Sequence, residues 1–144
     1  MNHAELQRMT EERLRDADAL MAGGRWAFAY YVAGYAVECA LKACLLKRMV
    51  LTGWVFDESA KRVDECRTHD FATIIKIAGM QDDLFRKLED RGAEAASFRV
   101  NWSVVAGWRV TSRYDEKSET EARTLIAAIT DEPDGVMTWI RNYW

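Results

Sequence analysis

The feature that most constrains the fold is a long apolar stretch from Trp26 to Lys47, which reads WAFAYYVAGYAVECALKACLLK. Glu38 and Lys42 are the only charged residues between Arg25 and Lys47, so nearly every face of this segment is apolar. Alanine recurs, proline is absent, and the run is too long for a buried strand. A helix that is apolar on all sides is usually surrounded by other elements. The stretch therefore predicts the central helix of an all-α domain.

A membrane span is the alternative explanation for so long an apolar run. In that case Glu38 and Lys42 would lie within the bilayer, at a cost of about 2.5 to 3.5 kcal/mol each. The N-terminal residues are polar and lack the apolar segment of a secretory signal. Cys39, Cys44 and Cys66 are odd in number and form no CxxC pair, as expected for reduced thiols. We therefore expect a cytoplasmic protein that does not enter a membrane.

Glu38 and Lys42 stand four residues apart, so on a helix they lie one turn apart in the favourable order for an ion pair. One interpretation is a buried or half-buried pair that fixes how neighbouring helices dock. The other places both residues at the edge of a ligand groove. The sequence leaves both interpretations open.

The rest of the chain predicts further amphipathic helices around the central one. Capping-box spacing of Asn2 with Glu5 begins the first helix, which the pair Gly23–Gly24 ends. Thr68 is expected to cap a later helix, with Asp70 in its first turn.

Between Gln81 and Val105 we expect one kinked helix or two short ones, because Gly92 interrupts the pattern. Ser118 and Glu121 have capping-box spacing and begin another helix. The tail from Val136 onward places several apolar side chains on one helical face. So aromatic an end is expected to mark an interface.

The length of 144 residues fits a single domain. We expect a helical core over about residues 5–130 and an aromatic tail helix over 136–144. The predicted fold class is all-α, an up-and-down bundle of four or five helices. A net charge of −3 indicates no overall basicity, so any nucleic-acid site must be a local patch.

The string AGYAVECALKACL, followed by THDF and later by Arg113 and Tyr114, resembles the HEPN family of small helical domains. The resemblance covers roughly residues 5–130. It implies a helical bundle that forms a homodimer, binds nucleotide or RNA, and is often encoded beside a minimal nucleotidyltransferase partner. A place in a toxin–antitoxin or defence system is a further expectation. The matching residues are Ala33, Ala36, Val37, Glu38, Leu41, Lys42, Ala43, Thr68, His69 and Asp70.

Ribonucleases of that family carry a motif in which four to six residues separate an arginine from a following histidine. The resemblance implies that the arginine stabilises phosphate charge and that the histidine serves in acid–base cleavage. Arg62 and His69 have six residues between them and fit this spacing. The family places its motif later, however, where this chain has Arg113 and Tyr114 with no histidine after them. Thr68 as a helix start would also separate Arg62 from His69. We therefore favour binding over catalysis, with His69 as a structural, hydrogen-bonded residue.

Two stretches are locally basic, residues 95–114 and residues 39–56. The first combines arginines with aromatic residues, as contact with phosphates and stacking on bases require. The alternative is that its tryptophans, Trp102 and Trp108, belong to the core. The candidate ligand-binding residues are Glu38, Lys42, Arg99, Arg109, Arg113 and Tyr114.

No other enzyme signature is present, and two histidines cannot supply a His-rich metal site. We expect no metal and no cofactor. A nucleophilic role for Cys66 beside His69 lacks an orienting third group. Three hypotheses follow from the sequence. The first is a module that binds nucleotide, RNA or a nucleotidyltransferase without cleaving RNA. The second is an endoribonuclease that uses Arg62 and His69, with help from Arg113 and Tyr114, and the third is a scaffold that assembles a partner complex through its tail.

Overall fold

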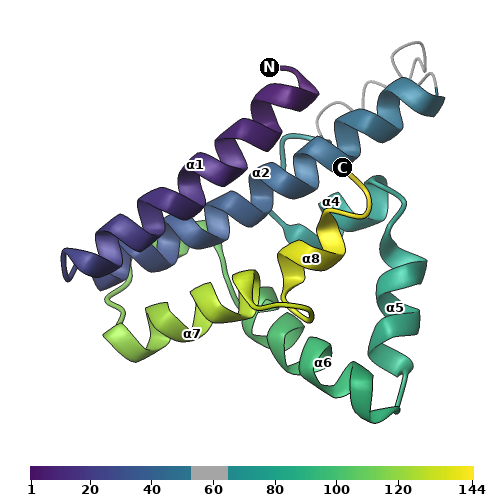
Figure 1. The fold of residues 1–144 in the computed structure, drawn as a ribbon. Helices are drawn as coiled ribbons and strands as arrows, with labels where there is room; N and C mark the ends of the chain where they lie inside the picture. The colour runs from purple at the N-terminus through teal and green to yellow at the C-terminus, as the bar shows by residue number, and fades with distance from the viewer. Residues whose placement is uncertain (53–64) are drawn as a thin grey trace.

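The structure is a computed structural model that describes residues 1–52 and 65–144, and it is helical throughout these ranges (Figure 1). The all-α prediction is confirmed. Seven α-helices lie in the described ranges, more than the four or five expected, because breaks divide the middle of the chain into short helices. The elements are α1 (His3–Ala22), α2 (Trp26–Thr52), α4 (Phe71–Ile77), α5 (Gln81–Glu89), α6 (Ala93–Ala106), the 3₁₀ helix η2 (Val110–Tyr114), α7 (Glu119–Thr130) and α8 (Val136–Ile140).

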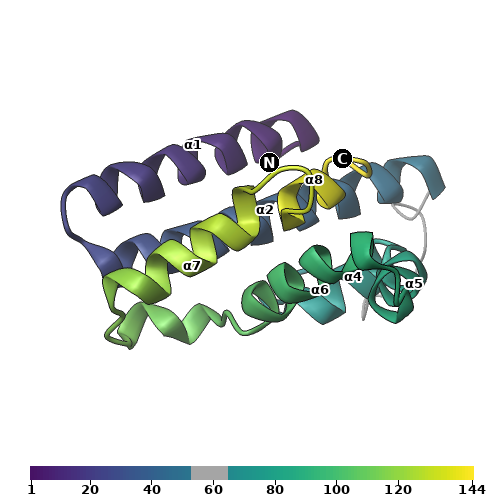
Figure 2. The same ribbon diagram turned by 60° about the horizontal axis from the view of Figure 1, so that its bottom comes forward.

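Helix α2 is the centre of the bundle, as its apolar sequence predicts. It contacts α1, α4, η2, α7 and α8, and α1 runs antiparallel beside it (Figures 1 and 2). The side chains of Ala33, Val37, Ala40 and Leu41 are completely buried. Of the described helices, α2 alone is long and apolar enough to cross a membrane by length and composition, and 72% of its apolar window is buried inside the protein.

The two predicted capping boxes are confirmed. Asn2 Oδ1 accepts a hydrogen bond from the Glu5 backbone at 2.9 Å, and Glu5 Oε2 accepts one from the Asn2 backbone at 2.7 Å. Ser118 and Glu121 form the same reciprocal pair at the start of α7. Each box satisfies backbone N–H groups that the first turn of a helix leaves without partners. Local sequence therefore determines where both helices begin.

The expected cap at Thr68 is wrong, because α4 begins two residues later. Asp70 is the N-cap: its Oδ2 accepts hydrogen bonds from the Thr73 backbone at 2.9 Å and from the Thr73 hydroxyl at 2.6 Å. Thr68 Oγ1 instead accepts the backbone N–H of Asp70 at 3.0 Å. The two side chains thus form consecutive turns, and His69 lies between them, outside the helix.

The segment from Gln81 to Val105 forms two helices, the second of the two expected arrangements. Helix α5 ends at Glu89, and α6 begins after Gly92, whose backbone N–H donates to Asp90 Oδ1 at 2.8 Å. The segment after α6 leaves the helical pattern at Gly107 and continues into η2. Helix α4 packs on α2 and α5, and α6 lies against both α5 and α7 (Figure 2).

The aromatic tail is part of the core of its own domain, which corrects the expectation of an apolar interface there. Val136, Met137, Trp139 and Ile140 are all buried, against α2, α6 and α7. The last residue, Trp144, packs beside the cluster formed by Leu6, Cys39 and Ala43. The division into a core of about residues 5–130 and a tail helix does not describe this packing, because the tail completes the core.

A single carboxylate of α5 holds this tail in place. Asp83 Oδ2 accepts a hydrogen bond from the Trp139 indole at 2.9 Å and another from the Tyr143 hydroxyl. These bonds, the one from Trp139 first, lower the pKa of Asp83. Burial and the bond to Asp83 raise the pKa of Tyr143 to about 12. At neutral pH the pair is therefore an ionised acceptor with a protonated donor.

Candidate functional site

Glu38 and Lys42 form the ion pair that their spacing predicts. Lys42 Nζ donates to Glu38 Oε1 at 2.8 Å. The Glu38 side chain is only 2% exposed, whereas that of Lys42 is 23% exposed. The carboxylate therefore lies inside the bundle, and the ammonium leads from it toward the surface.

The second partner of Glu38 is His69, which comes from the segment before α4. Its Nδ1 lies 2.8 Å from Glu38 Oε1 and 3.0 Å from Oε2. A carboxylate can only accept, so Nδ1 donates and the histidine is protonated on that nitrogen. The His69 side chain is 51% exposed, and Nε2 has no hydrogen bond among the described residues. His69 therefore makes the structural hydrogen bond expected of it, and its imidazole is also half exposed.

We call Glu38, Lys42 and His69 the carboxylate cluster. A buried carboxylate needs partners, because burying an unpaired charge is costly. Here two cationic or donor groups from two different elements share it, and this pins the segment before α4 onto α2. The geometry also fixes the orientation of one half-exposed imidazole, as a carboxylate does for histidine in acid–base sites.

The cysteines near the cluster are poor nucleophiles. Burial, followed by the negative charge of Glu38, raises the pKa of Cys39 to about 11. Burial also raises the pKa of Cys66, and the charge of Glu65 raises it further. Both thiols are therefore protonated at neutral pH, and the nucleophilic role considered for Cys66 has no support here.

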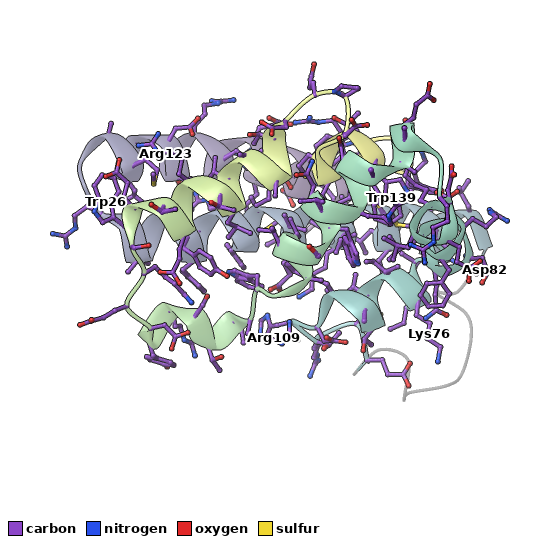
Figure 3. The ribbon with its side chains drawn as sticks, turned by 90° about the horizontal axis from the view of Figure 1, so that it is seen from below. Trp26, Lys76, Asp82, Arg109, Arg123 and Trp139 are labelled. Carbon is purple, nitrogen blue, oxygen red and sulfur yellow. The ribbon has the colours of Figure 1, made fainter. Side chains whose placement is uncertain are left out.

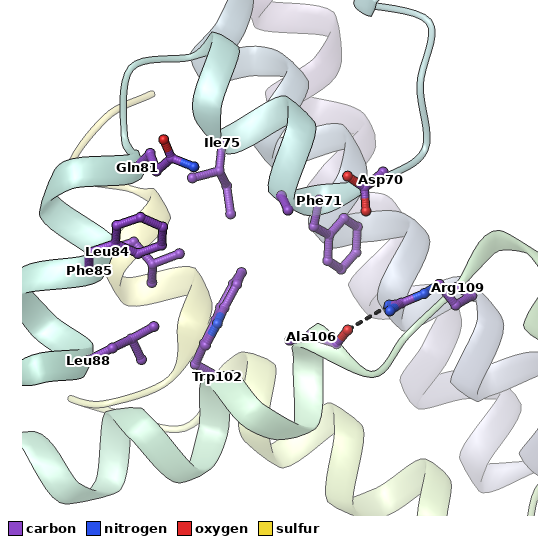
Figure 4. A pocket seen from close by; sticks show the side chains of 11 residues that line it. Asp70, Phe71, Ile75, Gln81, Leu84, Phe85, Leu88, Trp102, Ala106 and Arg109 are labelled. Atoms are coloured by element: carbon purple, nitrogen blue, oxygen red, sulfur yellow. Dashed lines mark hydrogen bonds between the residues drawn. The ribbon is translucent and has the colours of Figure 1, made fainter.

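Next to His69 in the chain, Asp70 lies at the mouth of a cavity between α4, α5 and α6 (Figure 4). The cavity volume is about 320 Å³. Arg109, which follows α6, lies at the same mouth. The pKa of Asp70 is lowered by hydrogen bonds from the side chain and backbone of Thr73 and, more weakly, by the charge of Arg109. The cavity walls are apolar, with Phe71, Ile75, Leu84, Leu88 and Trp102 among them.

The predicted arginines do not form one patch. Arg99 donates to the backbone carbonyl of Asp90, near the start of α6. Arg109, at the other end of that helix, donates through Nη1 to the carbonyls of Ala106 at 2.6 Å and Trp108 at 2.8 Å. Arg113 lies on η2 with its guanidinium 4.8 Å from the ring centre of Tyr114. Arg109 alone among them lines the cavity.

The aromatic residues of this stretch divide in the same way. Trp108 is 2% exposed and stacks between Phe71 and Tyr31, with ring centroids 5.1 Å and 6.1 Å away. It is a core residue, the alternative that the sequence left open. Trp102 lines the cavity, and Tyr114 is 76% exposed. Only Tyr114 therefore offers an open ring next to an arginine.

Arg62, the proposed catalytic partner of His69, lies outside the described residues. No group of three or more His, Cys, Asp or Glu side chains suited to a metal ion occurs within residues 1–52 and 65–144.

Sequence reasoning singled out Glu38, Lys42 and His69 but missed the contact that joins the first to the last. These residues are 31 positions apart, and no periodicity connects them. It also missed the cavity, whose walls come from three short helices. The only available signal was the paired occurrence of the two matching motifs, which carry Glu38 and His69.

No family model, curated protein or solved structure matches this chain.

Proposed function

We propose that this chain is a HEPN-like helical module that binds a nucleotide or an RNA strand without cleaving it. The observation that carries the proposal is the carboxylate cluster, in which buried Glu38 holds Lys42 and a half-exposed His69 together at the surface. Lys42 supplies donors for phosphate or ribose oxygens, and Nε2 of His69, with Nδ1 donating to Glu38, can accept a hydrogen bond from a ribose hydroxyl. All three residues of this cluster belong to the motifs that suggest the family.

A second feature supports a strand rather than a free phosphate. Tyr114 exposes most of its ring, and Arg113 lies over it. Exposed aromatic rings beside cations are the surfaces on which single-stranded bases stack, at about 1 to 3 kcal/mol per base. Figure 3 shows Arg109 between the end of the molecule that carries Trp26 and Arg123 and the end that carries Lys76 and Asp82.

Fluorescence anisotropy with a labelled single-stranded RNA tests the proposal. We expect Lys42→Gln and Tyr114→Ala to weaken binding about three- to tenfold, and Lys42→Gln to reduce the salt slope by about one phosphate contact. Arg123→Gln on α7 is the matched control, since that side chain is 67% exposed and its one ion pair among the described residues is with Glu119 in its own helix. Wild-type protein that binds no RNA at low salt would refute the proposal.

An endoribonuclease is the second candidate function, and one contact favours it. Glu38 orients His69 as a carboxylate orients the imidazole of a general base, and Nε2 has no hydrogen bond within residues 1–52 and 65–144. We expect purified wild-type protein to leave total RNA and tRNA intact. Cleavage that His69→Ala abolishes would establish the nuclease instead, and Arg62→Ala would then show whether the family spacing applies.

Partners remain proposals of the same kind. The resemblance supports a homodimer and a nucleotidyltransferase partner, in a toxin–antitoxin or defence setting and in the cytoplasm. Because the tail helix is buried, a dimer would use other surfaces, such as the exposed Phe28 and Val100. Sedimentation at micromolar concentration should give a dimer, and a monomer would contradict this expectation.

A further inference from the structure

The cavity between α4, α5 and α6 has the size and walls of a small-molecule site. At about 320 Å³ it lies at the lower end of the range for ligand pockets. Trp102 and Phe71 face it from different helices, and Leu84 and Leu88 close the side formed by α5 (Figure 4). Such walls favour one compact apolar group of the size of a large amino-acid side chain.

Its mouth carries two opposite charges that do not pair with each other. Asp70 uses Oδ2 for both bonds to Thr73, and Oδ1 has no hydrogen bond among the described residues. Arg109 uses Nη1 for its two carbonyl bonds, and no hydrogen bond of its Nε or Nη2 occurs in that same part of the chain. No ion pair joins Asp70 to Arg109 in the described ranges, although the charge of Arg109 contributes weakly to the lowered pKa of Asp70. One carboxylate oxygen and two guanidinium nitrogens thus remain available beside an apolar cavity.

A ligand with one charge would satisfy only half of this mouth. An anion would be attracted by Arg109 but repelled by Asp70. A cation would be attracted by Asp70 but repelled by Arg109. A zwitterion neutralises both groups. When its positive and negative groups are attached to the same carbon atom, each group can contact one of two partners that are too far apart to pair directly.

We propose that this cavity binds a free α-amino acid with a large apolar side chain, whose ammonium contacts Asp70 and whose carboxylate contacts Arg109. The side chain enters between Phe71 and Trp102. A nucleotide is disfavoured at this position, because its phosphate would bring about two negative charges next to Asp70. The inference is independent of RNA binding at the carboxylate cluster.

Isothermal titration of the full chain with L-phenylalanine, L-leucine and L-tryptophan is the direct test. N-acetyl-L-phenylalanine removes the positive charge, and L-phenylalanine amide removes the negative one. We expect at least one free amino acid to bind, and both derivatives of phenylalanine to bind about tenfold more weakly than phenylalanine itself.

Two variants make the test specific for the assigned contacts. Arg109→Gln should bind the free acid and the amide equally, and Asp70→Asn should lose discrimination against the N-acetyl derivative. Asparagine caps a helix about as well as aspartate, so Asp70→Asn should keep α4 intact. Arg123→Gln and Asp18→Asn are the matched controls on exposed positions of α7 and α1, and both should retain full discrimination.

Three results would overturn the inference: no binding of any amino acid at millimolar concentration, derivatives that bind as well as the parent, or discrimination that the two variants leave unchanged. Adenosine and guanosine monophosphates serve as competitors. A nucleotide that binds in the cavity and is lost with Arg109→Gln would assign the site to nucleotides instead. RNA binding that depends on Lys42 and Tyr114 would be unaffected by any of these outcomes, so the two proposals fail separately.

Discussion

At the scale of single residues, the buried carboxylate of Glu38 joins side chains from two separate parts of the chain. Glu38 is 2% exposed and serves two partners, Lys42 from its own helix and His69 from a distant segment. Taking such a charge out of water is compensated only while its hydrogen bonds are intact. Each partner therefore has an effect on stability that is independent of any ligand.

Replacing Lys42 with methionine should destabilise the protein. The variant keeps most of the apolar stem but leaves buried Glu38 with His69 as its one remaining partner among the described residues, so we expect a loss of about 1 to 3 kcal/mol. Urea unfolding followed by circular dichroism measures it. Lys76→Met, on the exposed face of α4, is the control and should change stability by less than about 0.5 kcal/mol. Equal effects of the two substitutions would contradict the role given to the ion pair.

A glycine in α2 makes room for a core tryptophan. A Cβ atom at Gly34 would lie 2.2 Å from Cδ1 and Nε1 of Trp108, which is itself packed on Phe71 and has little freedom to move. The sequence alone does not predict the contact between Gly34 and Trp108. Gly34 lies in the interior of a predicted helix, and Trp108 lies in a basic stretch.

Gly34→Ala should consequently destabilise the fold by about 1 to 3 kcal/mol through overpacking, despite the higher helix propensity of alanine. Gly23→Ala is the comparison, because its added Cβ would meet nothing closer than 3.5 Å and its backbone φ of −87° suits any residue. Thermal unfolding of both variants gives the contrast. A Gly34→Ala protein as stable as wild type would mean that Trp108 can move aside.

At the scale of elements, the sequence was most informative where a helix start depends on its own residues. The boxes at Asn2–Glu5 and Ser118–Glu121 were found by spacing alone, because both partners lie within one turn. The start of α4 was misplaced because Thr68 and Asp70 are both good caps, and the bonds from the Thr73 backbone and hydroxyl favour Asp70. The contacts of His69 and of the tail were beyond reach, since they join distant segments.

The contact between α5 and the tail gives a pH dependence. The folded-state pKa of Asp83 lies below its usual value, so the unfolded state binds the proton more readily. The stabilisation from Asp83 is complete above the unfolded pKa and is lost as pH falls through the folded one. We therefore expect wild-type stability to fall more steeply below about pH 4 than that of Asp83→Asn.

Chemical unfolding between neutral and acidic pH measures this difference. Asp82→Asn is the matched control, because the neighbouring carboxylate is exposed and receives no bond from the tail. Its stability should follow the wild-type pH profile. Parallel profiles for wild type and Asp83→Asn would show that the indole and hydroxyl bonds do not favour the ionised form.

At the scale of the whole molecule, the tail is a structural part of the fold and not a removable arm. Deleting residues 136–144 removes Val136, Met137, Trp139 and Ile140, all buried. We expect the truncated chain to lose cooperative unfolding, as judged by circular dichroism melting. Asn142→Ala, an exposed substitution in the same segment, should melt like wild type. A truncated chain that stays folded and loses only association would restore the scaffold hypothesis.

The position of α8 also has a consequence for biosynthesis. Cys44 in the central helix donates to the carbonyl of Ile140, 96 residues later in the chain, whereas α1 and α2 are neighbours in sequence. A nascent chain can thus form its first helical hairpin early but leaves one side of α2 uncovered until α8 has emerged from the ribosome. During that interval Cys44 is open to thiol reagents, and the uncovered apolar face of α2 is open to chaperones. Ribosome-bound chains arrested before Val136 should therefore be labelled at Cys44, and chains in which residues 136–144 have emerged and folded should be protected.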